Sequence, residues 1–175
     1  MPLPPLHRVG MQPLRLTLAT HGPEETLELG RQLGRLLVAG DLVALVGDLG
    51  AGKTCLVQGI AQGLDVPESS YVRSPSFVIL NVHAGRCDLN HLDLYRIHSP
   101  AELEDLGYRE IFYGEGVTLI EWADKIEGLL PDNHFRVSLD FRNETERAIA
   151  LEGIGDLPRE RWEALRSALA GFAVG

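Results

Sequence analysis

One segment constrains this chain more than any other: it reads Gly-Asp-Leu-Gly-Ala-Gly-Lys-Thr and runs from Gly47 to Thr54. An apolar run at 42–46 comes directly before it, and a run suited to a helix, residues 55–63, follows directly. Glycines at this spacing let successive backbone N–H groups face phosphate oxygens, and the helix N-terminus adds its positive dipole end. The order of strand, loop and helix therefore predicts a phosphate-binding loop whose ligand is a nucleoside triphosphate.

The loop also predicts what its side chains contact. Lys53 is placed to reach the β- and γ-phosphates, and the Thr54 hydroxyl is placed to bind Mg²⁺. We expect a nucleoside triphosphate and Mg²⁺ as the ligands, with nucleotide contacts along Asp48, Leu49, Gly50, Ala51, Gly52, Lys53, Thr54 and Cys55.

Length and charge narrow the remaining possibilities. At 175 residues, with 45% apolar and 23% charged residues, the chain has ordinary globular values and no room for a second catalytic domain. Its net charge of −9 argues against direct binding of nucleic acid, which needs a basic stripe. Four arginines at 73, 86, 96 and 109 could still form a local basic patch, but solvated surface arginines are the better interpretation.

Two cysteines, Cys55 and Cys87, are too few for a disulfide framework or a four-thiol metal site, so we expect both to be reduced. The first residues lack a signal-peptide segment, and no stretch has the length of a membrane span, which predicts a cytoplasmic protein with no membrane contact. The proline-rich start predicts a disordered arm over 1–13, ahead of a single P-loop ATPase domain over 14–175.

Apolar periodicity and turn residues predict alternating strands and helices. Strands are expected at 14–18, 42–46 and 117–120, and hairpins at 77–82 with 87–94 and at 134–142 with 145–152. Helices are expected at 23–39, 55–64, 99–107, 124–130 and 158–172, the last with Trp162, Leu165 and Leu169 in the core. We expect an α/β fold: a P-loop NTPase-like three-layer sandwich with a mixed, largely parallel central sheet.

A phosphate-loop enzyme needs a carboxylate near Mg²⁺, at the C-terminal end of a neighbouring strand. Glu121 ends the apolar run at 117–120, and Asp93 lies in a segment whose alternation places His91, Asp93 and Tyr95 on one face. The alternative roles are a surface acid at a strand end for Glu121 and a loop-capping carboxylate for Asp93. Imidazole, carboxylate and phenol would each need a partner if buried, so this face is hard to explain as core.

Five segments in this order resemble one family. They are the phosphate loop, Ser74-Pro75-Ser76-Phe77, His91-Leu92-Asp93-Leu94-Tyr95-Arg96, Leu103 to Gly107, and Glu121-Trp122-Ala123-Asp124-Lys125. Over about residues 14–150 the chain is similar to TsaE, also called YjeE, an ATPase of tRNA threonylcarbamoyladenosine modification. The resemblance implies a small α/β ATPase that binds the TsaD–TsaB pair and sustains multiple turnover of TsaD, with tRNA contacted only through the complex.

The resemblance also implies residue roles. It makes Lys53 the phosphate ligand, Thr54 and Glu121 the Mg²⁺ ligands, and Asp93 the catalytic acid of the second motif alongside Glu121, with Trp122 as an aromatic group of the nucleotide site. Two positions depart from the family pattern. Ser76 replaces a threonine but keeps the hydroxyl, so a contact with the nucleotide survives; Cys55 replaces a second threonine and is a poorer hydrogen-bonding group for the α-phosphate.

Three rival functions remain to be weighed against an ATPase of tRNA modification. A GTPase normally reads guanine with an Asn-Lys-x-Asp segment, and neither Lys53 nor Lys125 lies in one. A small-molecule or nucleotide kinase is the better alternative, since it also has a phosphate loop and uses arginines as a phosphate clamp. A module that binds ATP without turnover is disfavoured by the acids Asp93 and Glu121.

Overall fold

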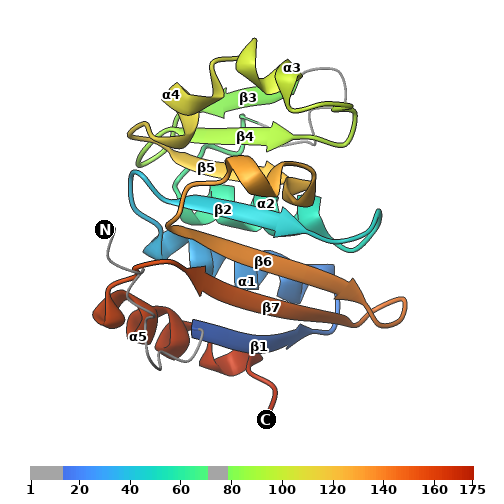
Figure 1. Cartoon of the computed structure of the whole chain (residues 1–175). Coiled ribbons are helices and arrows are strands. Elements are labelled where there is room, and N and C mark those ends of the chain that lie inside the picture. The colour runs from blue at the N-terminus through green and yellow to red at the C-terminus, as the bar shows by residue number, and fades with distance from the viewer. Residues whose placement is uncertain (1–13, 71–78) are drawn as a thin grey trace, which may run out of the picture.

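A seven-stranded sheet organises the protein, whose computed structural model describes residues 14–70 and 79–175 (Figure 1). In these residues the strands are β1 (Leu14–Thr20), β2 (Leu42–Val46), β3 (Leu80–His83), β4 (Leu89–Asp93), β5 (Val117–Glu121), β6 (His134–Phe141) and β7 (Arg147–Ile154). The α-helices are α1 (Pro23–Leu36), α2 (Lys53–Gly63), α3 (Ala101–Glu104), α4 (Tyr108–Phe112) and α5 (Arg159–Ala168), and the 3₁₀ helices are η1 (Ala123–Leu129) and η2 (Ala170–Phe172).

The strands lie in the order β1-β7-β6-β2-β5-β4-β3, which makes β2 the central strand. β6, β2, β5 and β4 pair in parallel, whereas β7 and β3 are antiparallel to their neighbours. Since β1 pairs antiparallel with β7, it runs with the central four, so five of the seven strands in the described residues share a direction. The expected mixed, largely parallel sheet is confirmed, and its central strands all end at the edge where β2 leads into the loop 47–52.

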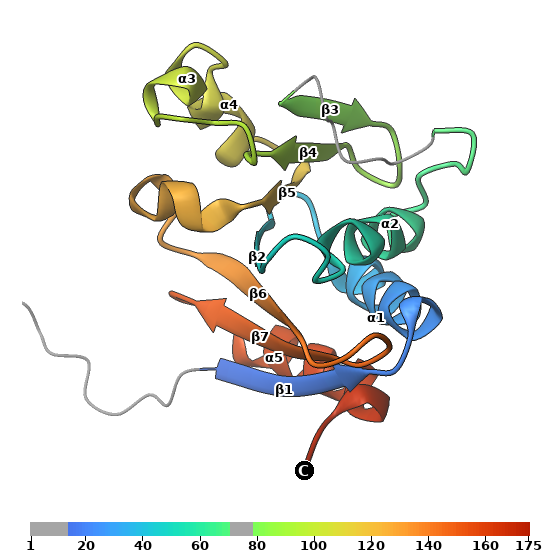
Figure 2. The ribbon, with the colours of Figure 1, turned by 90° about the vertical axis from the view of Figure 1, so that its right-hand side faces the viewer.

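Helices cover both faces of this sheet and make three layers, as expected (Figure 2). Because side chains alternate along a strand, Val43 and Leu45 of β2 point to the face that α1, α2 and α5 cover, while Leu42 and Ala44 point to the other. The first face holds the larger core, and Trp162, Leu165 and Leu169 belong to it as predicted. The second core is built with α3, α4 and η1.

Glycines bring α1 and α2 into backbone contact. Gly30 and Gly34 on α1 face Gly59 and Gly63 on α2, each pair separated by one helical turn. A Cβ added to Gly59 would lie 2.2 Å from the Leu27 carbonyl oxygen, and one added to Gly34 would lie 2.3 Å from that of Ile60. No other residue fits at these positions without displacing backbone, so the glycines fix where α2 lies on the sheet.

Several predicted helix bounds are corrected by the structure. α1 ends at Leu36 rather than 39, because Leu37 already has extended backbone angles. The single helix expected at 99–107 is only α3, and a second helix, α4, follows Gly107, whose φ of 67° interrupts the helical path. The segment expected as 124–130 is the 3₁₀ helix η1, and the helix expected to reach 172 stops at Ala168 before η2.

Two of the arginines considered as a possible basic patch, Arg86 and Arg109, lie on opposite faces of the sheet. Arg86, in the β3–β4 turn, donates to the carbonyls of Leu37 at 3.1 Å and Gly34 at 2.9 Å, and so caps the end of α1. Arg109 of α4, on the other face, pairs with the exposed Glu104 and stacks on the Tyr108 ring. Arg73 lies outside the described residues. Among the described members of the set, Arg86 therefore has a structural role that the sequence interpretation did not include.

Candidate nucleotide site

The predicted phosphate loop connects the end of β2 at Val46 to the start of α2 at Lys53. Gly50 and Gly52 have φ values of 81° and 100°, the left-handed region that side chains with a Cβ rarely adopt. A hydrogen bond of 3.0 Å from the Ala51 N–H to the Asp48 carbonyl closes the turn. These angles bring the chain sharply around to the N-terminus of α2, whose first backbone N–H groups have no partner within the helix. The loop thus has the backbone that an anion site requires.

Lys53 occupies the centre of this loop and is only 5% exposed. Its ammonium donates to the carbonyls of Gly47 and Asp48, the latter at 2.9 Å, and its Nζ lies 4.0 Å from the centre of the Trp122 ring. Burial lowers the pKa of Lys53, while the charges of Glu121, Asp93, Asp48 and Asp124 oppose that shift. A cation is thus held where the chain provides carbonyl dipoles and nearby carboxylates but no anion in direct contact among the described residues.

Glu121, at the end of β5, connects the loop to the neighbouring strands. Its Oε1 accepts the Thr54 hydroxyl at 3.1 Å, and its Oε2 lies 2.7 Å from Nε2 of His91 on β4. Glu121 is 2% exposed and His91 fully buried, so this chain of contacts lies inside the protein. The structure therefore brings together Thr54 and Glu121, the two side chains expected to hold Mg²⁺.

Asp93 ends β4 directly opposite Glu121 in the parallel pairing of β4 and β5. Its Oδ1 accepts the Tyr95 N–H at 2.9 Å, which turns the chain away from the strand. The expected common face of His91, Asp93 and Tyr95 is therefore wrong for Tyr95: β4 ends at Asp93, so the alternation does not continue. Asp93 has the loop-capping contact of the alternative interpretation, and its charge also acts on Lys53.

Trp122 follows Glu121 in a left-handed conformation with φ 61° and ψ 38°, which is uncommon for a residue with a large side chain. Its ring lies between the Lys53 ammonium and the Tyr95 ring, whose centre is 5.1 Å away. Beyond Tyr95, Lys125 donates to the Tyr95 and Ile97 carbonyls. The strained backbone is thus accompanied by ring contacts with Lys53 and Tyr95.

The β6–β7 hairpin reaches the loop from the side opposite Glu121. Arg147 lies 4.7 Å from the centre of the exposed Phe141 ring and bonds the Asn143 carbonyl at 2.8 Å. A Cβ built on Gly52 would lie 4.0 Å from Arg147 Nε. Arg147 could not be assigned to this site from the sequence, because it is distant in the chain and is placed there only by the pairing of β7 with β6 and of β6 with β2.

The donor chemistry at this edge fits a triphosphate with Mg²⁺. Lys53 and the N-terminus of α2 supply positive charge and N–H donors, while Thr54 and Glu121 supply the hard oxygen ligands that Mg²⁺ prefers. Across residues 14–70 and 79–175 there is no group of three or more His, Cys, Asp or Glu side chains that could hold a metal alone.

The remaining residues predicted to contact the nucleotide lie in different surroundings. Leu49 is 77% exposed, so its side chain is directed to solvent at the rim of the loop. The Cys55 thiol donates to the Pro23 carbonyl at 3.2 Å, which directs it towards α1, and burial raises the pKa of this thiol. Only the backbone of Cys55 is therefore left as a phosphate donor. Ser76 lies outside the described residues.

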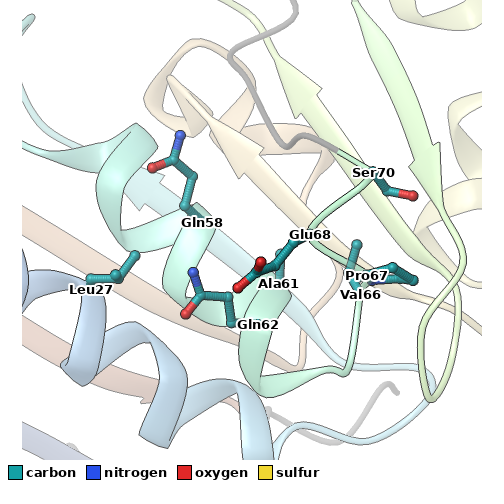
Figure 3. Close-up of a pocket in the computed structure, with 8 residues that line it drawn as sticks. All are labelled: Leu27, Gln58, Ala61, Gln62, Val66, Pro67, Glu68 and Ser70. Carbon is teal, nitrogen blue, oxygen red and sulfur yellow. The ribbon is translucent and has the colours of Figure 1, made fainter.

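A separate groove of about 400 Å³ lies along the outer side of α2 (Figure 3). Gln58 and Gln62 of α2 face it together with Glu68 and Ser70 of the following segment. None of the described residues that line it belongs to the phosphate loop or carries a basic group to balance a phosphate. Charge and donor chemistry therefore place the candidate nucleotide site at the edge of the sheet instead.

The layers, the sheet and the loop after the central strand define a P-loop NTPase-like α/β protein. The family described as threonylcarbamoyl adenosine biosynthesis protein TsaE matches residues 20–149, and the chain belongs to this family. It is 40% identical over 128 residues to the tRNA threonylcarbamoyladenosine biosynthesis protein TsaE of Treponema pallidum, covering 73% of this chain and 93% of that protein. The Bacillus subtilis protein of the same name is 38% identical over 143 residues, 81% of this chain and 88% of the relative.

A solved structure has a similar fold. The crystal structure of Bacillus subtilis YdiB superposes with a TM-score of 0.72 at 32% identity, over 93% of this chain and 98% of YdiB. Within the described residues, no helix is long and apolar enough to cross a membrane.

Proposed function

We propose that this protein binds ATP with Mg²⁺ and hydrolyses it in support of threonylcarbamoyladenosine formation on tRNA, acting with the TsaD–TsaB pair. Family membership supports the pathway. The observation that supports nucleotide chemistry is the meeting of Thr54 and Glu121 at 3.1 Å beside the buried ammonium of Lys53.

In this proposal each part of the loop has one task. Lys53 exchanges its contacts with Gly47 and Asp48 for the β- and γ-phosphates, and the backbone N–H groups at the start of α2 hold the phosphate chain. Thr54 and Glu121 hold Mg²⁺, which neutralises charge that develops on the phosphates. Since Glu121 lies on the β5 side of the loop, the nucleoside extends to the other side, towards Arg147 and Phe141.

Asp93 is the candidate for orienting the attacking water. It lies across from Glu121 in the strand pairing and close enough to Lys53 for its charge to act on that ammonium. A carboxylate at this place accepts a hydrogen bond from water and directs the oxygen at the γ-phosphate.

Partners complete the site in this proposal. Lys53 is the cation closest to the expected γ-phosphate in the described part of the chain, and the net charge of −9 provides no general basic surface. Phosphoryl-transfer sites completed in trans can gain about 10³-fold or more in rate. We therefore expect weak hydrolysis by the protein alone, an ATP-favoured complex with TsaD–TsaB, and contact with tRNA only through that complex.

Steady-state formation of threonylcarbamoyladenosine by TsaD and TsaB, with and without this protein and ATP, tests the proposal. We expect multiple turnover only when it is present, and we expect Asp93→Ala to reduce turnover more than complex formation measured by size exclusion. Asp132→Ala is the matched control, because Asp132 precedes β6 and so lies at the opposite ends of the parallel strands from the phosphate loop. Turnover indifferent to the protein, with phosphorylation of a small metabolite instead, would establish the kinase alternative.

A further inference from the structure

His91 is a buried polar residue with no role in the proposal so far. It lies on β4 two residues before Asp93, and its side chain is 0% exposed. Its Nε2 is 2.7 Å from Oε2 of Glu121, on the neighbouring strand β5. Burying an imidazole between two parallel strands is costly unless its hydrogen bonds are made, so this contact calls for a reason.

Only one of the two groups can donate the hydrogen bond between His91 and Glu121. An ionised carboxylate can only accept, so Nε2 carries the hydrogen and donates it to Glu121. The second ring nitrogen, Nδ1, is buried without a hydrogen-bond partner in the described residues. The ring is therefore held by a single hydrogen bond to Glu121.

The two carboxylate oxygens of Glu121 have different partners. Oε2 is held by His91, and Oε1 is directed at Thr54 of the phosphate loop. A glutamate has three side-chain torsions, and a buried one without a second partner could rotate away from the loop. With His91 in place, the Oε1 edge stays on the Thr54 side.

We propose that His91 is a positioning residue for the metal site: its Nε2–H fixes the carboxylate of Glu121 so that Oε1, with the Thr54 hydroxyl, faces the cation. This inference rests on the proposed Mg²⁺–nucleotide site. Partners of this kind orient metal ligands in many proteins, and their loss typically costs about 10–100-fold in metal affinity.

Two amide variants separate this role from general packing. His91→Gln places an N–H at the same number of bonds from the backbone as Nε2, whereas the N–H of His91→Asn reaches only as far as Nδ1. The probe is Mn²⁺ in place of Mg²⁺: binding to the protein saturated with ADP is titrated by the electron paramagnetic resonance signal of free Mn²⁺. ADP binding in EDTA is measured by calorimetry.

We expect Mn²⁺ to bind His91→Asn about 10–100-fold more weakly and His91→Gln within about threefold of the unchanged protein. ADP affinity in EDTA should be the same for all three. His83→Asn is the control, since His83 on β3 has a buried nitrogen without a partner in the described residues but forms no hydrogen bond with Glu121 there. It should bind Mn²⁺ normally. If His91→Asn does not fold, His91→Phe replaces it as the test variant, because phenylalanine also has a planar ring but lacks the N–H donor.

Two results would overturn the inference in different ways. Unchanged Mn²⁺ affinity in His91→Asn, or equal losses in the Gln and Asn variants, would reduce His91 to a packing residue and leave the proposed function intact. Failure of the unchanged protein with ADP to take up Mn²⁺ would overturn the metal–nucleotide site itself.

Discussion

The two faces of the sheet are built in different ways. On one face α1 and α2 are long, meet through glycines, and share the larger core with α5. On the other, α3, α4 and η1 are four, five and seven residues long and cover a smaller core. That second face also carries the stack of Trp122 on Tyr95, with Tyr95 half exposed.

This difference divides the candidate site. α2 supplies Lys53 and Thr54 from the face where backbone lies against backbone, so these groups have little freedom to move. Trp122 and Tyr95 come from short turns on the face with less buried surface, where local opening costs less free energy. We therefore expect the phosphate-binding half to be rigid, and the changes that accompany nucleotide binding to occur on the side of Trp122.

The two lysines should differ most. Lys53→Ala removes the buried ammonium of the loop, so we expect ATP affinity to fall about 1,000-fold, or about 4 kcal/mol, in titration calorimetry. Lys125→Ala removes contacts with the Tyr95 and Ile97 carbonyls and with the Tyr95 ring, on the other face. It should change affinity by less than about threefold. Equal losses would show that Lys125 belongs to the nucleotide site.

Glycines give the next contrast. Gly59→Ala places a Cβ 2.2 Å from the Leu27 carbonyl oxygen, whereas a Cβ on Gly128 in η1 meets nothing within 4 Å. We expect the first to destabilise by about 3 kcal/mol and to lower Tm by roughly 6–12 °C in differential scanning calorimetry. Gly128→Ala should leave Tm unchanged. A similar small shift for both would mean that α1 and α2 separate readily.

The arginine pair should show a smaller effect. Arg86→Ala leaves the last carbonyls of α1 without their cationic cap, which we expect to cost about 1 kcal/mol and roughly 2–4 °C in Tm. Arg109→Ala breaks a surface pair with Glu104, and such pairs contribute little. Thermal melts followed by circular dichroism measure both. The comparison of faces fails here if the Arg109 variant is the less stable one.

The tryptophans should report the smallest change, in fluorescence rather than stability. The Trp122 ring lies 4.0 Å from Lys53 Nζ, so ATP binding should alter its surroundings, whereas Trp162 is buried in α5. We expect the emission change on adding ATP to persist in Trp162→Phe and to vanish in Trp122→Phe. The opposite result would place the movement on the α1 face.

Local patterns allowed most of the fold to be predicted. β2, the phosphate loop and α2 follow from consecutive residues, and the hairpin of β6 and β7 follows from alternation around a polar turn. The order of the strands depends on contacts between distant segments, which periodicity does not show. α4 was missed because five residues are too few to show a helical period, and Tyr108 and Phe112 are held there by burial in the second core.

The site likewise has parts that local sequence patterns predict and parts that depend on contacts between distant segments. Thr54 and Glu121 could be paired in advance, because a phosphate loop and the end of a parallel strand meet at one edge of a sheet. The contact of His91 with Glu121, and the approach of Arg147 to the loop, depend on strand pairing and hairpin shape. The glycine contact was predictable in principle, since Gly30 and Gly34 on α1 and Gly59 and Gly63 on α2 repeat the same four-residue spacing.

The hydrogen bonds of Lys53 to its own loop have a consequence for affinity. In the proposed site, an arriving nucleotide would not meet a free cation; it would compete with the carbonyls of Gly47 and Asp48 for the same three N–H groups. Binding is therefore an exchange, and its net free energy is smaller than the count of new contacts would suggest. A loop that satisfies its own lysine can release nucleotide without leaving a buried charge unpaired, which favours repeated loading and unloading over permanent occupancy.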